Sequence, residues 1–164
     1  MYVVSNSSPL IHLSKIGLLH ILHEIFDDII IPEAVYQECV VQGDHRDDAK
    51  MIDDAPWIRV KQIKNEYTHL KKAFLKDIDQ GESEAIVLAL QESADLILLD
   101  EYDARELARN HDLRITGVIG VLMKAKKIGK IDDLRKHLDA LRSSGFWIND
   151  ILYEKICKTS ETIG

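Results

Sequence analysis

Short apolar runs alternate along the chain with longer segments in which apolar residues recur every three or four positions. Apolar runs bounded by polar residues are typical of buried strands, and the longer spacing is typical of helices. The runs that predict strands are 2–5, 29–31, 57–63, 95–100 and 113–116. The segments that predict helices are 8–25 with a break at Gly17, 32–40, a short helix near 50, 82–92, 102–111, 118–127 and 132–142. This alternation predicts an α/β protein, a three-layer α/β/α sandwich with a central parallel sheet.

The length and composition favour one globular domain. The chain has 164 residues, 46% of them hydrophobic and 30% charged. It contains only three prolines and eight glycines, which argues against long linkers. We expect a single domain over residues 1–164, in which the last ~20 residues form a C-terminal extension.

Cysteine usage and hydropathy predict a soluble, cytoplasmic protein. Cys39 and Cys157 lie far apart and form no CxxC pair, which argues against a disulfide framework and a cysteine zinc site. No run approaches the roughly 18 apolar residues of a membrane span, and no basic leader precedes an apolar stretch. The net charge of −7 does not favour nonspecific nucleic-acid binding, although a local basic patch and a cluster of carboxylates are compatible with it.

Polar residues gather just after the predicted strands. Asn6 follows the first strand, Asp100 ends the most apolar one, and Asp103 lies one turn further. Glu38 lies in the helix after the second strand, and Glu82 opens a helix after a glycine. Since ligands of parallel sheets bind beyond the carboxyl ends of the strands, we expect these side chains to converge. Each acid alone is as easily a helix cap or part of a solvated face, so the prediction of a Mg²⁺ or Mn²⁺ site depends on the whole set.

Several blocks of the sequence resemble the DUF3368 group of the PIN-domain superfamily, and together they span nearly the whole chain. The block from Gly81 to Gly120 is the most specific. The matching blocks are Val4-Ser5-Asn6-Ser7-Ser8-Pro9-Leu10-Ile11, Ile31-Pro32-Glu33-Ala34-Val35-Tyr36-Gln37-Glu38, Asp79-Gln80-Gly81-Glu82-Ser83-Glu84-Ala85-Ile86, Leu98-Leu99-Asp100-Glu101-Tyr102-Asp103-Ala104-Arg105, Thr116-Gly117-Val118-Ile119-Gly120-Val121-Leu122 and Ser144-Gly145-Phe146.

This resemblance implies a nuclease site. PIN domains are similar to FEN-type nucleases in placing three or four acids around Mg²⁺ or Mn²⁺, and many of them cleave single-stranded RNA. Carried over residue by residue, the resemblance puts Asn6 at the first metal-ligand position, Glu38 at the second, Glu82 at the third and Asp100 at the fourth, with Asp103 as an auxiliary acid. The acids Glu38, Glu82, Asp100 and Asp103 are then also the expected catalytic residues.

Two positions of this set carry alternatives. Glu84 competes with Glu82 for the third position, and we prefer Glu82 because it lies at the start of the predicted helix. Most PIN nucleases have Asp at the first position, where this chain has Asn6. An amide oxygen still binds a hard cation but brings no charge, so we expect weaker metal affinity and weak or absent catalysis.

Ser8 and Arg105 are the expected substrate-binding residues. The Ser8 hydroxyl is placed to contact a metal-bound water or a phosphate, and Arg105 to hold an RNA phosphate. The alternatives are that Ser8 caps the first helix and that Arg105 pairs with Glu101. The basic stretches 124–136 and 71–76 are interpreted either as a track for the phosphate backbone or as solvated helix faces.

We therefore predict a divalent-metal-dependent endoribonuclease that cleaves single-stranded RNA, the toxin of a toxin–antitoxin pair. The resemblance implies a homodimer controlled by an antitoxin protein, with no role for a membrane. One alternative is a catalytically weakened module that binds RNA or a partner protein. Another is a different metal-dependent phosphotransfer enzyme on a similar fold, which leaves the full set of matching blocks unexplained.

Overall fold

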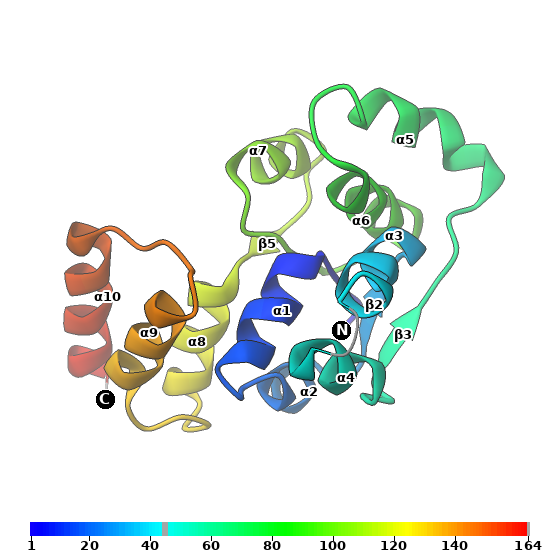
Figure 1. Cartoon of the computed structure of the whole chain (residues 1–164). Helices are drawn as coiled ribbons and strands as arrows, with labels where there is room; N and C mark the ends of the chain where they lie inside the picture. Colours follow the sequence, from blue (N-terminus) through cyan, green and yellow to red (C-terminus); the bar gives the residue numbers. More distant parts are fainter. Residues whose placement is uncertain (44–45, 164) are drawn as a thin grey trace.

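A computed structural model describes residues 1–43 and 46–163, and it has a five-stranded sheet at its centre (Figure 1). Every strand pair is parallel, and the strand order is β3-β2-β1-β4-β5. The strands are β1 (Val3–Ser5), β2 (Ile29–Ile31), β3 (Ile58–Val60), β4 (Leu96–Leu98) and β5 (Ile115–Thr116). Each lies within a run that the apolar pattern predicted, and the expected three-layer architecture is confirmed.

The helices of the first half begin close to the predicted positions. They are α1 (Ser7–Lys15), α2 (His20–Phe26), α3 (Glu33–Tyr36), the π-helical segment η1 (Gln37–Val41) and α4 (Asp47–Asp53). Gly17, at φ +74°, separates α1 from α2, as the pattern predicted. The alternative that Ser8 caps the first helix is wrong, because α1 begins at Ser7 and Asn6 occupies the N-cap position.

The second half contains two helices that the sequence pattern did not predict. The elements are the 3₁₀ turn η2 (Asn65–Tyr67), α5 (Thr68–Phe74), α6 (Gln80–Gln91), α7 (Tyr102–Asn110), α8 (Val118–Lys127), α9 (Leu134–Ser143) and α10 (Asp150–Ile163). One is α5, in which only Phe74 is buried, so it carries no continuous apolar stripe. The other is α10, in the segment that was expected only to be a C-terminal extension.

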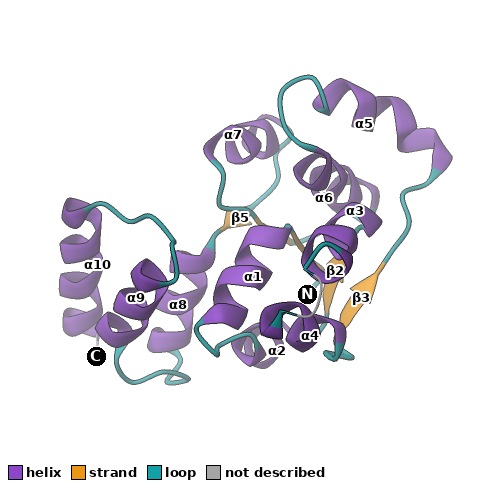
Figure 2. Ribbon diagram, viewed as in Figure 1, coloured by secondary structure: helices purple, strands orange, loops and turns teal. Residues whose placement is uncertain are grey.

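The helices cover both faces of the sheet. Figure 2 shows α2 and α8 on one side and α6 and α7 on the other. The contacts agree, since α2 packs on β2, α6 packs on β1 and β4, and both α7 and α8 reach β5. The core lies between these layers and includes the fully buried Leu10, Leu22, Ile31, Ile86 and Leu98. Among the described residues, none of the helices is both long enough and apolar enough to span a bilayer.

The order of the strands reverses at β1. The chain runs from β1 outward through β2 to β3, then returns to β4 on the other side of β1 and continues to β5. The carboxyl ends of β1 and β4 therefore form the switch point at which parallel sheets usually bind ligands. Asn6 and residues 99–101 follow these two strands directly.

Candidate metal-dependent active site

Asn6 lies at the centre of the switch point. Its extended backbone carries the chain from β1 into α1, and its N–H donates to the carbonyl oxygen of Leu98 at 3.0 Å. The residue is 3% exposed, and its Oδ1 is buried with no hydrogen-bond donor among the described residues. A buried acceptor without a donor costs free energy. This oxygen is therefore available to a ligand.

Glu38 reaches the same region from η1. Its half-buried carboxylate accepts a hydrogen bond from Ser7 Oγ at 2.6 Å and another from the backbone N–H of Gly81. Burial raises the pKa of Glu38, and the charges of Asp79 and Glu84 raise it further, whereas the two hydrogen bonds lower it. The carboxylate is thus held by specific donors despite the cost of burial.

Asp100 is held between α1 and α8. Its Oδ1 accepts the N–H of Val118 at 3.0 Å, and its Oδ2 accepts the hydroxyl of Ser8 at 3.4 Å. Burial raises the pKa of Asp100 to about 6, against the opposing effects of these donors and of Arg105. The group is still mainly ionised at pH 7, so it can serve as an anionic metal ligand.

Glu82 belongs to a capping box at the start of α6. The N-cap Asp79 accepts the N–H of Glu82 at 2.8 Å, and Glu82 Oε2 accepts the N–H of Asp79 at 3.2 Å. Burial raises the pKa of Glu82 to about 6, with a further rise from the charge of Asp79. Glu82 thus stabilises the helix and also contributes charge to the site.

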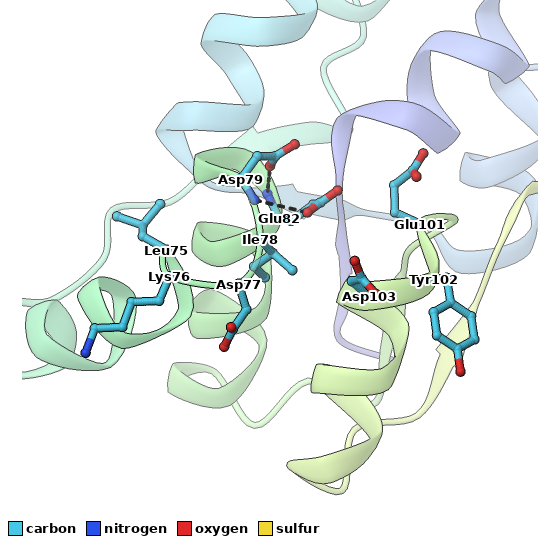
Figure 3. Close-up of a pocket in the computed structure, with 9 residues that line it drawn as sticks. All are labelled: Leu75, Lys76, Asp77, Ile78, Asp79, Glu82, Glu101, Tyr102 and Asp103. Atoms are coloured by element: carbon cyan, nitrogen blue, oxygen red, sulfur yellow. Dashed lines mark hydrogen bonds between the residues drawn. The ribbon is translucent and has the colours of Figure 1, made fainter.

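A pocket of about 440 Å³ opens beside Glu82, between the segment before α6 and the start of α7 (Figure 3). Figure 3 shows the carboxylates of Glu82 and Asp103 on its two sides, and the ring of Tyr102 pointing away from them. The residues that line it are Leu75, Lys76, Asp77, Ile78, Asp79, Glu82, Glu101, Tyr102 and Asp103. Five of these nine carry carboxylates, so the pocket suits a cation better than an anion.

The acids form one electrostatic environment. The charge of Glu38 raises the pKa of Glu82, and the charge of Glu101 raises the pKa of both Glu82 and Asp100. Groups from η1, from α6 and from the loop after β4 therefore lie close enough to repel each other. Asp103 lines the same pocket as Glu82. A bound cation relieves such repulsion.

Glu84, the alternative to Glu82, is engaged elsewhere. It is 6% exposed and pairs with Lys71 Nζ of α5 at 2.8 Å. It also accepts the N–H of Ala34 at 3.1 Å and the side-chain amide of Gln80 at 3.3 Å. These contacts compensate its charge without a metal, which leaves Glu82 as our preferred ligand.

The two expected substrate-binding residues both face Asp100. Ser8 donates to its carboxylate, as described above, and Arg105 Nη1 donates to the carbonyl oxygen of Leu99 at 2.8 Å while its charge lowers the pKa of Asp100. Within the described ranges, Arg105 makes no ion pair with Glu101. As placed here, both side chains support the acid rather than project toward solvent.

The donors fit a hard divalent cation. Asn6, Glu38, Glu82, Asp100 and Asp103 offer only oxygen atoms, and the orphaned Oδ1 of Asn6 is a ready neutral ligand. Across residues 1–43 and 46–163, no three His, Cys, Asp or Glu side chains are close enough to hold an ion by themselves. A hard divalent cation held here would take one or two of these carboxylates and complete its coordination with waters.

Other acids of the pocket lay outside the set predicted from the sequence, and the sequence did not predict the contact that Ser7 makes. Asp79 and Glu101 add negative charge to the pocket, and Ser7 holds Glu38. The D-x-x-E spacing of the capping box was a usable signal for Asp79. Glu101 and Ser7 directly follow Asp100 and Asn6, but no local pattern marks their contacts.

The fold and the candidate site lead to the class. This is a parallel α/β protein with oxygen-bearing side chains and a buried, unpartnered Asn6 Oδ1 at the carboxyl edge of its sheet. The family model DUF3368, described as a PIN domain, matches residues 2–162, and the chain belongs to this family. PIN domains are generally metal-dependent nucleases, so the family supports a nuclease and a divalent-metal cofactor in general terms. None of the curated proteins searched matches the chain.

Proposed function

We propose that this protein is a Mg²⁺- or Mn²⁺-dependent endoribonuclease that cleaves single-stranded RNA. The observation that carries the proposal is the grouping of Glu38, Glu82 and Asp100, from three separate elements, around the switch point that also holds the unpartnered Oδ1 of Asn6. A generic α/β protein has no reason to bury several repelling carboxylates beside an unsatisfied amide.

Each residue has a definite task in this proposal. Glu38 and Asp100, fixed by hydrogen bonds, hold the cation, and Asn6 adds a neutral oxygen. When bound, the cation lowers the pKa of a coordinated water and offsets the charge on a scissile phosphate. Glu82 completes the negative side of the site, and Asp103, across the pocket, orients the attacking water.

The test is cleavage of a fluorescent single-stranded RNA with Mn²⁺, with and without EDTA. We expect the wild type to cleave the RNA, and EDTA, Glu38→Gln and Asp100→Asn each to abolish cleavage. Glu106→Gln, an exchange of a partly exposed acid that pairs with Arg109 on α7, serves as the matched control and should retain activity. Cleavage that survives EDTA or Asp100→Asn would contradict the metal mechanism.

One observation favours a second candidate, a PIN module with weakened catalysis that binds RNA or a partner protein. Asn6 places a neutral amide where a charge would hold the cation most strongly. The discriminating result is RNA binding, measured by fluorescence anisotropy, without cleavage by the wild type but with cleavage after Asn6→Asp.

The proposal extends to a toxin restrained by an antitoxin protein, which is supported by membership of the PIN family. Induced expression should then arrest growth of a bacterial host, and Asp100→Asn should relieve the arrest. Equal growth inhibition by both proteins would contradict the toxin role but leave the nuclease proposal standing.

A further inference from the structure

Glu38 and Asp100 are contacted by two adjacent serines. Ser7 Oγ donates to Glu38 Oε2 at 2.6 Å, and Ser8 Oγ donates to Asp100 Oδ2 at 3.4 Å. Both serines belong to the first turn of α1, directly after β1. Because each serine reaches one carboxylate, this single turn ties together two acids that come from distant parts of the chain.

Each carboxylate also lies against the beginning of a second helix. Glu38 accepts the backbone N–H of Gly81 at the start of α6. Asp100 accepts the N–H of Val118, the first residue of α8, at 3.0 Å, and the N-cap of that helix is Gly117. Each acid therefore has a serine on one side and a backbone N–H at a helix start on the other, which is the N–H of Gly81 for Glu38 and that of Val118, next to Gly117, for Asp100.

The glycines provide the space that the carboxylates occupy. A Cβ on Gly81 would lie 2.1 Å from Glu38 Oε1, and a Cβ on Gly117 would lie 2.3 Å from Asp100 Oδ1. Neither position needs the left-handed backbone that favours glycine, since Gly81 is inside a helix and Gly117 has φ −123°. The missing side chain, and not the backbone conformation, is what the site requires at both positions.

We propose that Ser7, Ser8, Gly81 and Gly117 are positioning residues that form two carboxylate seats. One seat fixes Glu38 and the other fixes Asp100 before any cation arrives. This inference rests on the proposed function, because it assigns these seats to a metal site. Partners that orient metal ligands commonly change metal affinity by roughly 10- to 100-fold when they are removed.

Gly81→Ala separates this role from a role in folding. The atom in its way is the far end of the flexible Glu38 side chain, which can move aside at little cost. Alanine is also a better helix former than glycine. The variant should therefore fold at least as stably as the wild type while its Glu38 carboxylate is displaced. Gly117→Ala is less suitable, because the shorter Asp100 side chain and the Leu99 carbonyl at 3.2 Å leave less freedom.

The experiment measures Mn²⁺ affinity of the full chain at pH 7.5 by calorimetry, together with urea unfolding. We expect Gly81→Ala and Ser7→Ala to weaken binding about tenfold or more. Ser83→Ala is the control on α6, because the buried Ser83 hydroxyl has no partner among the described residues. Ser14→Ala is the control on α1, because the Ser14 hydroxyl donates to the carbonyl oxygen of Leu10, within its own helix and away from both carboxylates. Both controls should bind Mn²⁺ as the wild type does.

A crystal structure of Gly81→Ala provides a readout that needs no metal. We expect the Glu38 carboxylate to have left Ser7 Oγ, and a carboxylate still within hydrogen-bond distance would overturn the inference. Unchanged Mn²⁺ affinity in both variants would also overturn it, provided that Glu38→Gln weakens binding. If Glu38→Gln itself does not change Mn²⁺ affinity, Glu38 is not a metal ligand. That result would contradict both the role of Glu38 in the proposed function and the inference about the residues that position it.

Discussion

At the scale of single residues, the unusual feature is the burial of polar groups without full compensation. Asn6 Oδ1, His12 Nδ1 and Ser83 Oγ are buried without hydrogen-bond partners among the described residues. Each such group lowers stability unless something outside the chain compensates it. Of the three, Asn6 directly follows β1 at the switch point of the sheet, so it is the one that we connect with function.

Asn6→Asp tests the electrostatic state of the site. An additional carboxylate should raise Mn²⁺ affinity and, without metal, lower the free energy of unfolding by about 1–3 kcal/mol through burial and repulsion. Calorimetry and urea unfolding in EDTA measure the two effects. Asn110→Asp, at the exposed end of α7, should change neither quantity appreciably. Equal Mn²⁺ affinity of Asn6→Asp and the wild type would contradict the placement of Asn6 in the site.

His12 predicts a pH dependence that is independent of the site. Burial, followed by the nearby charge of Lys15, lowers the pKa of His12 below 6.5, and its ring packs edge-on against Phe146 at 5.0 Å. Below pH 6.5, His12 binds a proton more readily in the unfolded chain than in the folded chain. The free energy of unfolding therefore falls as the pH falls through this range. Unfolding free energies between pH 5 and 7.5 should show a smaller decline for His12→Gln. An identical decline would exclude His12 as a cause.

At the scale of elements, the site depends on how helices are tied to one another. Glu84 links three of them, since it contacts Ala34 at the start of α3, Gln80 in α6 and Lys71 in α5. Glu38 follows α3 directly, in the π-helical segment η1. π-helical segments inside helices often occur at functional sites. The buried Glu84 therefore helps to hold the helix that delivers Glu38.

Glu84→Ala should lower the free energy of unfolding by about 2–3 kcal/mol. The change leaves the Ala34 N–H and the half-buried Lys71 ammonium without their partner. Urea unfolding measures the loss, and Glu106→Ala on the exposed face of α7 should cost much less. A similar small loss in both variants would show that Glu84 does not anchor α3 and α5.

At the scale of the whole molecule, the sheet brings distant segments to one edge. Asn6, Glu38, Glu82 and Asp100 belong to different elements of the chain, yet the reversal of strand order at β1 places the ends of β1 and β4 side by side. A cation bound there would join ligands from several elements of the fold. Its binding energy should therefore appear as stability of the entire fold.

Mn²⁺ should raise the thermal unfolding temperature, and EDTA should reverse the rise. At a free concentration about 100 times Kd, linkage predicts roughly 2.7 kcal/mol of added stability. Differential scanning fluorimetry measures the shift, which Asp100→Asn should remove and Asp132→Asn, on the exposed turn before α9, should not. A shift of equal size in both variants would place the metal elsewhere.

The sequence by itself determined the elements of the sheet and the types of ligand. Local apolar patterns are sufficient for this, because a strand or an amphipathic helix is specified by its neighbours along the chain. The local pattern predicted the strand Leu96–Leu98 and the position of Asp100 after it, and it also predicted that Asn6 follows β1. The pattern did not predict helix α5, because this helix buries little apolar surface.

Only the tertiary structure decided how the acids are held. The hydrogen bonds of Ser7 to Glu38 and of Ser8 to Asp100, and the space above Gly81 and Gly117, join residues far apart in sequence. The ion pair of Glu84 with Lys71 also becomes visible only in the tertiary structure. Such contacts depend on distances between packed layers, and a linear pattern carries no information about those distances.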